Sequence, residues 1–293
     1  MRIGILVLFG LLLMCGSGYC RPIVHSFCLD PGHGGSSDPG TSNGSIREAD
    51  VALDCVDWLF LRIMVIGYDA DSAYFTRIDN SPVTIDKRYR IANDLERDAY
   101  DRQAPCPVRY FLSLHLNSGG STAHGSCILV KQLSGQTKCS MGSCTPGDAS
   151  CPFNAPDTST ANFKLGLDVI NTIGSSSCGS WQFGAFEQCD GGFLGRALGG
   201  YVPPRDGILG RNSSIGILYY SQAYATVLVE TEFLSNSQFV QNVLVPSYSS
   251  WCYEMGKAIA NGLECFADKD DPSGSGPSGR DRVVLWPVTA RGD

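Results

Sequence analysis

The chain has 293 residues, 43% of them hydrophobic, which suffices for one large domain or two small ones with a buried core. Its formal net charge of -7 at pH 7 argues against a nucleic-acid partner, because binding to phosphates needs a basic face. The same charge predicts weak attraction to anionic surfaces.

The N-terminal residues resemble a secretory signal peptide. Arg2 precedes an apolar stretch over residues 3–14, which is too short to span a bilayer, and small residues follow it. Neither Cys15 nor Cys20 follows the small residue that lipoprotein processing prefers. We expect cleavage near Gly18, hence a signal peptide over residues 1–18 and a secreted or periplasmic protein with no transmembrane span.

The cysteine content predicts disulfides. Thirteen cysteines, one of them in the expected signal peptide, leave twelve in a chain that enters an oxidising compartment. Six of them lie in a segment rich in Gly, Ser, Thr and Pro that cannot pack a core without cross-links: Cys127, Cys139, Cys144, Cys151, Cys178 and Cys189. A zinc knuckle of Cys139, Cys144 and Cys151 is the weaker alternative, because no C-x2-C pair is present. The sequence leaves the connectivity open.

Strand-like and helix-like segments alternate over residues 22–130, a pattern typical of an α/β domain. We therefore predict a single domain with a central, mostly parallel twisted sheet flanked by helices. The first expected elements are a strand over 23–29, an amphipathic helix capped by Ser45 or a neighbour with Ala52, Cys55, Val56, Leu59, Phe60, Ile63 and Met64 inward, a strand over 74–76, a helix over 86–99 with Ile91, Ala92 and Leu95 inward, and a strand over 109–114.

The regular pattern is interrupted after residue 130. The later expected elements are a strand over 125–130, a helix over 160–173, a strand over 227–230 and a helix over 248–263. Cysteine-rich inserts occupy about 133–157 and 175–204. The predicted catalytic domain covers 22–267, and the Asp, Pro, Ser and Gly composition of 268–293 indicates a flexible linker and a short tail.

Four chemically reactive side chains fall at one end of the predicted sheet: His33, Glu48, His115 and Glu230. His33 lies on a glycine-rich turn directly after the first strand, where ligands of open α/β sheets bind and where glycines admit a metal or substrate. Two imidazoles and a carboxylate leave one tetrahedral position of a zinc ion open for water. A further carboxylate nearby can take the proton of that water.

Each candidate also has a structural interpretation. Glu48 completes a capping box with Ser45, and taken alone capping is the safer interpretation. An isolated His115 is more often a buried, hydrogen-bonded core residue. Glu230 is either a costly buried carboxylate or a functional one, and Glu232 shares its strand face if the strand continues.

Four other polar residues carry weaker signals. We expect His25 to be a sheet residue and His124 a surface residue in a Gly-Ser-Thr loop. Arg77 and Arg88 are either structural or substrate-proximal ion-pair partners, and the structural role is favoured.

Four short motifs follow one another along the chain. They are Leu-Asp-Pro-Gly-His-Gly-Gly at 29–35, Arg-Glu-Ala-Asp-Val at 47–51, Ser-Leu-His-Leu-Asn at 113–117 and Val-Leu-Val-Glu-Thr-Glu-Phe-Leu-Ser-Asn at 227–236. Together they resemble the zinc-dependent N-acetylmuramoyl-L-alanine amidases of type 3, over about residues 22–265. Four ordered motifs are far more specific than any one of them.

The resemblance implies hydrolysis of the amide between N-acetylmuramic acid and L-alanine in peptidoglycan. It implies His33, Glu48 and His115 as ligands of Zn²⁺ and Glu230, rather than Glu232, as the catalytic glutamate. Two alternatives keep the fold: a zinc peptidase that cuts within the stem peptide, and a non-catalytic wall-binding protein. An activator or further wall-binding partner is not identified by the sequence.

The chain departs from the family pattern in two places. Glu232 stands where the family usually has a small residue, so a second carboxylate can crowd the site. Some 115 residues separate His115 from Glu230, and the excess falls in the cysteine-rich inserts. In some relatives an insertion here carries a helix that blocks the site, whereas these glycine-rich inserts favour a lid that shapes the substrate site or a wall-contact surface.

Overall fold

The computed structural model describes residues 26–68, 73–93, 108–119, 121, 123–131, 153–154, 159–183, 208–211 and 215–270. The predicted signal peptide, His25, most of the cysteine-rich inserts and the tail lie outside these residues. Among the cysteines singled out above, Cys139, Cys144, Cys151 and Cys189 do so as well. The division into leader, catalytic domain and tail therefore stays a prediction.

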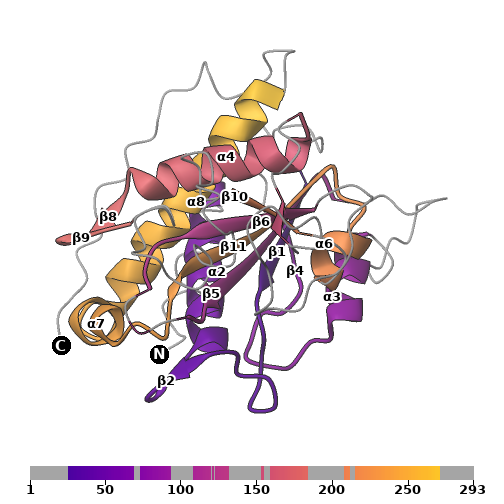
Figure 1. Cartoon of the computed structure of the whole chain (residues 1–293). Helices are drawn as coiled ribbons and strands as arrows, with labels where there is room; N and C mark the ends of the chain where they lie inside the picture. Colours follow the sequence, from indigo (N-terminus) through magenta and orange to yellow (C-terminus); the bar gives the residue numbers. More distant parts are fainter. Residues whose placement is uncertain are drawn as a thin grey trace, which may run out of the picture.

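A seven-stranded mixed sheet forms the centre of the molecule (Figure 1). Its strands, in spatial order, are β4 (Ala73–Phe75), β1 (Phe27–Pro31), β5 (Tyr110–Asn117), β11 (Ala225–Phe233), β6 (Cys127–Lys131), β10 (Ile208–Arg211) and β7 (Phe153–Asn154). The first four are mutually parallel, β6 is antiparallel to β11, β10 is parallel to β6, and β7 is antiparallel to β10. The predicted mostly parallel α/β sheet is thus confirmed.

Helices cover both faces of the sheet (Figure 1). The larger apolar layer packs α2 (Glu48–Val65), α4 (Ala161–Gly174) and α8 (Tyr248–Asp270) against one set of strand side chains. The other face carries α3 (Ile85–Ala92) and α6 (Gly216–Tyr220). Because both faces are covered, strand β11 is apolar without alternation at Val227, Leu228 and Val229, as buried parallel strands generally are.

Shorter elements lie at the periphery. They are the hairpin of β2 (Ser42–Asn43) and β3 (Ile46–Arg47), the hairpin of β8 (Ser177–Cys178) and β9 (Trp181–Gln182), the helix α7 (Ser237–Phe239) and the adjoining π-helix η3 (Val240–Leu244). Within the described ranges, no helix is both long and apolar enough to cross a bilayer.

Several element boundaries differ from the predicted ones. Strand β1 continues to Pro31, and α8 continues to Asp270, three residues into the predicted linker. The sequence predicts a cap by Ser45 or a neighbour. The cap position is the neighbouring Arg47, which makes no side-chain capping bond, because the β2–β3 hairpin leads directly into the helix. Helix α3 ends at Ala92, and Leu95 lies outside the described residues.

Candidate metal centre

The parallel strands β1, β5 and β11 end at one edge of the sheet, and the four candidate residues are carried to that edge. His33 lies two residues after β1, and His115 lies near the end of β5. Glu230 is paired in register with His115 on the neighbouring strand. Glu48 is the first residue of α2. Residues distant in the sequence therefore meet where open α/β sheets bind ligands.

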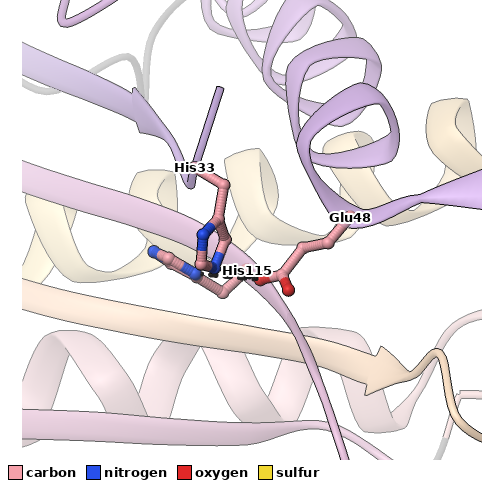
Figure 2. Close-up of side chains that lie close together, drawn as sticks. All are labelled: His33, Glu48 and His115. Carbon is pink, nitrogen blue, oxygen red and sulfur yellow. Dashed lines mark hydrogen bonds and ion pairs between the residues drawn. The ribbon is translucent and has the colours of Figure 1, made fainter. Parts of the chain in front are cut away.

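Three of the four side chains touch one another (Figure 2). Nε2 of His33 lies 3.2 Å from Oε1 of Glu48, and Nδ1 of His115 lies 3.0 Å from the same oxygen. One ligand atom from each residue can be chosen so that all three lie within 4.8 Å of one another. The structure thus brings His33, Glu48 and His115 together, as predicted, and this group can hold a metal ion.

Glu48 is buried and held by backbone donors from two separate segments. Its Oε1 accepts a hydrogen bond from the amide of Leu116 at 3.0 Å, and its Oε2 accepts one from the amide of Thr41 at 2.8 Å. Burial alone would raise the pKa of this carboxyl, but hydrogen bonds from His115 and His33 outweigh it and lower the pKa to about 2. Glu48 is therefore a carboxylate oriented toward two imidazoles, and the capping-box interpretation is wrong.

His33 is fixed in a strained conformation. Its φ of 55° lies in the left-handed region, which non-glycine residues rarely adopt outside turns and functional sites. Its Nδ1 hydrogen-bonds to Oδ1 of Asp38 at 2.6 Å, so that Nε2 faces Glu48. The hydrogen bond to Glu48 raises the pKa of His33 to about 9 against the opposing effect of burial, and Asp38 adds to the rise.

Two glycines provide the space for these side chains. A Cβ on Gly32 would lie 2.4 to 2.6 Å from three ring atoms of His115. A Cβ on Gly40 would lie 2.5 Å from Oε2 of Glu48 and 2.7 Å from Cδ2 of His33. Real Cβ atoms do not approach this closely, so any side chain here would displace the cluster.

One polar atom of the cluster indicates that a ligand completes it. Nε2 of His115 is buried and has no hydrogen-bond partner among the described residues. Leaving such an atom unsatisfied costs about 1–3 kcal/mol. Two imidazoles and one carboxylate are the donor set of a catalytic zinc site with a fourth position open. The residues present therefore fit a divalent zinc ion.

The turn between β1 and His33 is held by a buried carboxylate that lies outside the cluster. Asp30 is fully buried and accepts hydrogen bonds from the hydroxyls of Thr76 and Ser113 and from the guanidinium of Arg88. Arg88 also donates to the carbonyls of Pro31, at 2.6 Å, and of His33. The structural role expected for Arg88 is confirmed.

Arg77 holds the same turn from another side. It donates to the carbonyls of Pro31 at 2.9 Å, of Gly32 at 2.7 Å and of Ala49 at 2.7 Å. Ala49 follows Glu48 in α2, so one guanidinium connects the turn that carries His33 to the helix that carries Glu48. Its expected structural role is likewise confirmed.

Glu230 and Glu232 are separated by an irregularity in β11. Glu230 is half-buried and pairs with His115 in the ladder, but the register shifts between Glu230 and Phe233. In this bulge Glu232 is buried, and its Oε1 accepts hydrogen bonds from the amides of Gly125 at 2.7 Å and Phe233 at 2.9 Å. Bulges re-aim side chains in this way. Glu232 thus serves the loop before β6.

His124 differs from the expected surface residue. It is half-buried, with Nδ1 3.8 Å from Oε2 of Glu232 and its ring 5.6 Å from that of Trp181. The sequence reasoning also missed Asp30 and Asp38. The two carboxylates flank His33 in the sequence, eight residues apart around the glycine-rich turn. Carboxylates often orient metal-binding histidines, so their closeness to His33 is the sequence signal that could have identified them.

Comparison with known proteins gives one family. A family model described as N-acetylmuramoyl-L-alanine amidase matches residues 27–145, a range that includes His33, Glu48 and His115 but not Glu230. The sporulation-specific N-acetylmuramoyl-L-alanine amidase of Bacillus subtilis (strain 168) is 35% identical over 101 residues, 34% of this chain and 34% of that protein. The N-acetylmuramoyl-L-alanine amidase CwlM of Bacillus licheniformis is 35% identical over 95 residues, 32% of each chain. The matches thus span about a third of the length of these curated relatives.

The fold likeness extends further than the sequence likeness. The solved structure of the N-acetylmuramoyl-L-alanine amidase AmiC2 of Nostoc punctiforme superposes with a TM-score of 0.53. The superposition covers 86% of this chain and 99% of that one at 20% identity. At this identity the similarity establishes the shared fold.

Proposed function

We propose that this chain, which belongs to the N-acetylmuramoyl-L-alanine amidase family, hydrolyses the amide bond between N-acetylmuramic acid and L-alanine in peptidoglycan with the help of a zinc ion. The observation that carries the proposal is the convergence of His33, Glu48 and His115 within 4.8 Å at the carboxyl edge of the sheet. The three residues lie inside the range that the family model matches.

His33, Glu48 and His115 would hold the zinc ion. When bound, zinc supplies a Lewis acid that polarises the scissile carbonyl and lowers the pKa of a water molecule. Asp38 orients His33 through Nδ1, and the amides of Leu116 and Thr41 orient the Glu48 carboxylate. These partners hold the His33 and Glu48 side chains beside each other.

Glu230 is the proposed general base and acid. Its carboxylate takes a proton from the attacking water and delivers it to the departing nitrogen of L-alanine, which must leave as an amine. Its support is its place in β11, paired with His115 at the same edge of the sheet. Glu232 is not assigned a chemical step, because backbone amides occupy its Oε1.

Digestion of purified peptidoglycan by the zinc-loaded protein, followed by mass analysis of the products, tests the reaction. An amidase releases a free lactyl end and a new L-alanine amino terminus. Cleavage within the stem peptide would indicate a peptidase, and absence of products at full zinc occupancy would indicate a wall-binding protein. Either result overturns the proposal.

A matched pair of variants tests the role of Glu230. Glu230→Gln should retain zinc and peptidoglycan binding and lose about 10²–10⁴-fold in turnover, the usual contribution of a general base. Glu232→Gln, two residues along the same strand, should retain most of the activity. An active Glu230→Gln enzyme would contradict the assignment.

The substrate implies a place of action outside the cytoplasm. We propose that the protein is exported and acts in the periplasm or beyond the cell, in agreement with the apolar segment over residues 3–14. Detection of the N-terminus of the protein recovered from culture medium or periplasm, beginning near residue 19, tests this point.

A further inference from the structure

Helices α2 and α8 pack against each other on the face of the sheet that carries the larger apolar layer (Figure 1). Each presents one buried cysteine to the other: Cys55 is 1% exposed and Cys252 is 0% exposed. The mechanism proposed above uses neither thiol. A buried cysteine ordinarily packs as a small hydrophobic residue, and the position of this pair distinguishes it from that case.

The contacts between the two helices set Cys55 opposite Cys252. On one side of the pair, Tyr248 is hydrogen-bonded to Asp54. On the other side, the rings of Trp58 and Tyr253 are 5.2 Å apart. Further along, Nε of Arg62 lies 3.3 Å from Oδ1 of Asn261. Residue numbers on both helices increase in the same direction through these contacts, so the two helices are parallel. Contacts on both sides of the cysteines therefore fix which residues of α2 lie opposite which residues of α8.

A glycine brings the two backbones into contact one turn beyond the cysteines. A Cβ on Gly256 would lie 2.7 Å from the amide nitrogen of Leu59 and 2.9 Å from the carbonyl oxygen of Cys55. Helices approach closely where a small residue lies at the contact. Disulfides need Cα atoms about 4.4–6.8 Å apart, so two helices can be bridged only where their backbones approach closely, as they do here.

We propose that Cys55 and Cys252 form a disulfide that joins α2 to α8. The two thiols lose two protons and two electrons, and one S–S bond forms. The electrons reduce a disulfide oxidant, either glutathione disulfide or the disulfide of a dithiol oxidase, to two thiols through a mixed disulfide. The inference goes beyond the proposed hydrolysis and is independent of whether that proposal holds.

The surroundings of the thiols determine when the bond forms. Burial raises the pKa of the Cys55 thiol, and the neighbouring Cys252 side chain adds to the rise. Thiolates are the reacting species, and a disulfide oxidant has no access to the packed helix interface. The bond therefore forms during folding, before α8 closes on α2. Cys178, also buried, is a competing partner near Cys252.

Mass mapping tests the pairing directly. The full chain is refolded in a buffer of reduced and oxidised glutathione, denatured, alkylated without reduction and digested. The expected result is a pair of peptides linked through Cys55 and Cys252. Alkylation of both residues, or a link from Cys252 to Cys178 or to another cysteine, would overturn the proposal. The readout needs no enzymatic activity, so it is separate from the test of the proposed function.

Thermal unfolding gives a second, independent test. A phosphine reductant should lower the Tm of the wild-type protein by about 5–10 °C more than that of Cys55→Ala/Cys252→Ala. Cys265 is an exposed cysteine on α8, so the control variant Cys265→Ala should respond to the reductant like the wild type. Equal responses of wild type and double variant would refute the cross-link. If the double variant does not fold, the mass mapping decides.

Discussion

The two arginines of α3 provide a direct test of how the turn that carries His33 is held. Arg88 is 2% exposed and paired with the fully buried Asp30. Arg90, two residues further on the same helix, lies 3.9 Å from Asp86, and the two side chains are 40% and 65% exposed. Replacing each arginine by methionine removes one ion pair from the same element and preserves most of the side-chain volume.

The two substitutions should lower the free energy of unfolding by amounts that differ by several kcal/mol. Arg88→Met leaves a buried carboxylate without its cation, and breaking a buried pair in this way costs about 3–5 kcal/mol. The total stability of a domain is about 5–15 kcal/mol, so a large share of it is lost. Arg90→Met should cost about 0–1 kcal/mol, because exposed pairs contribute little.

Urea denaturation, monitored by tryptophan fluorescence, measures the stability of both variants. With a slope near 3 kcal/mol/M, the unfolding midpoint of Arg88→Met should fall by about 1–2 M and that of Arg90→Met by less than about 0.3 M. In Asp30→Asn/Arg88→Met the buried charge is absent, so this double variant should recover at least about 1 kcal/mol relative to Arg88→Met. Equal midpoints for the two single variants would refute the reasoning.

Three further substitutions, one of them with a control, test packing and metal retention. Gly256→Ala should separate α2 from α8 and cost about 1–3 kcal/mol by urea denaturation, whereas Gly174→Ala, which would meet nothing within 4 Å, should be neutral or stabilising. Gly32→Ala should displace the His115 ring and lower the zinc content, measured by atomic emission after gel filtration; full occupancy would contradict this. Asp38→Ala should weaken zinc affinity about 10–100-fold in a chelator competition without a change in fold, and an unchanged affinity would exclude its orienting role.

The convergence of the site was predictable because the candidates follow buried strands. His33 and His115 each end an apolar run, and parallel strands bring such ends to one edge. Glu48 was ambiguous, since a capping box and a ligand position have the same local pattern, and only the amides of Thr41 and Leu116 distinguish them. The sequence around Glu48 contains no information about the Leu116 amide, which lies 68 residues away in the chain.

Other features depend on geometry that residue spacing does not encode. The alternation of strand side chains predicts Glu232 on the face of Glu230, but a bulge adds one residue between Glu230 and Phe233, and Glu232 binds the amide of Gly125 instead. Whether Cys55 lies opposite Cys252 depends on how two helices nearly 200 residues apart in the chain align with each other. Neither is visible in hydrophobic periodicity.

Arg77 has a consequence for how the site exchanges its ion. Because its guanidinium connects the turn of His33 to the helix of Glu48, the donor atoms are oriented by the polypeptide itself. In small zinc-binding modules the ion organises the chain, and chelation unfolds it. Here removal of the ion would leave a folded apoprotein that regains its ligand geometry on rebinding. For the proposed zinc enzyme, the supply of the ion rather than refolding would then set the fraction of active molecules.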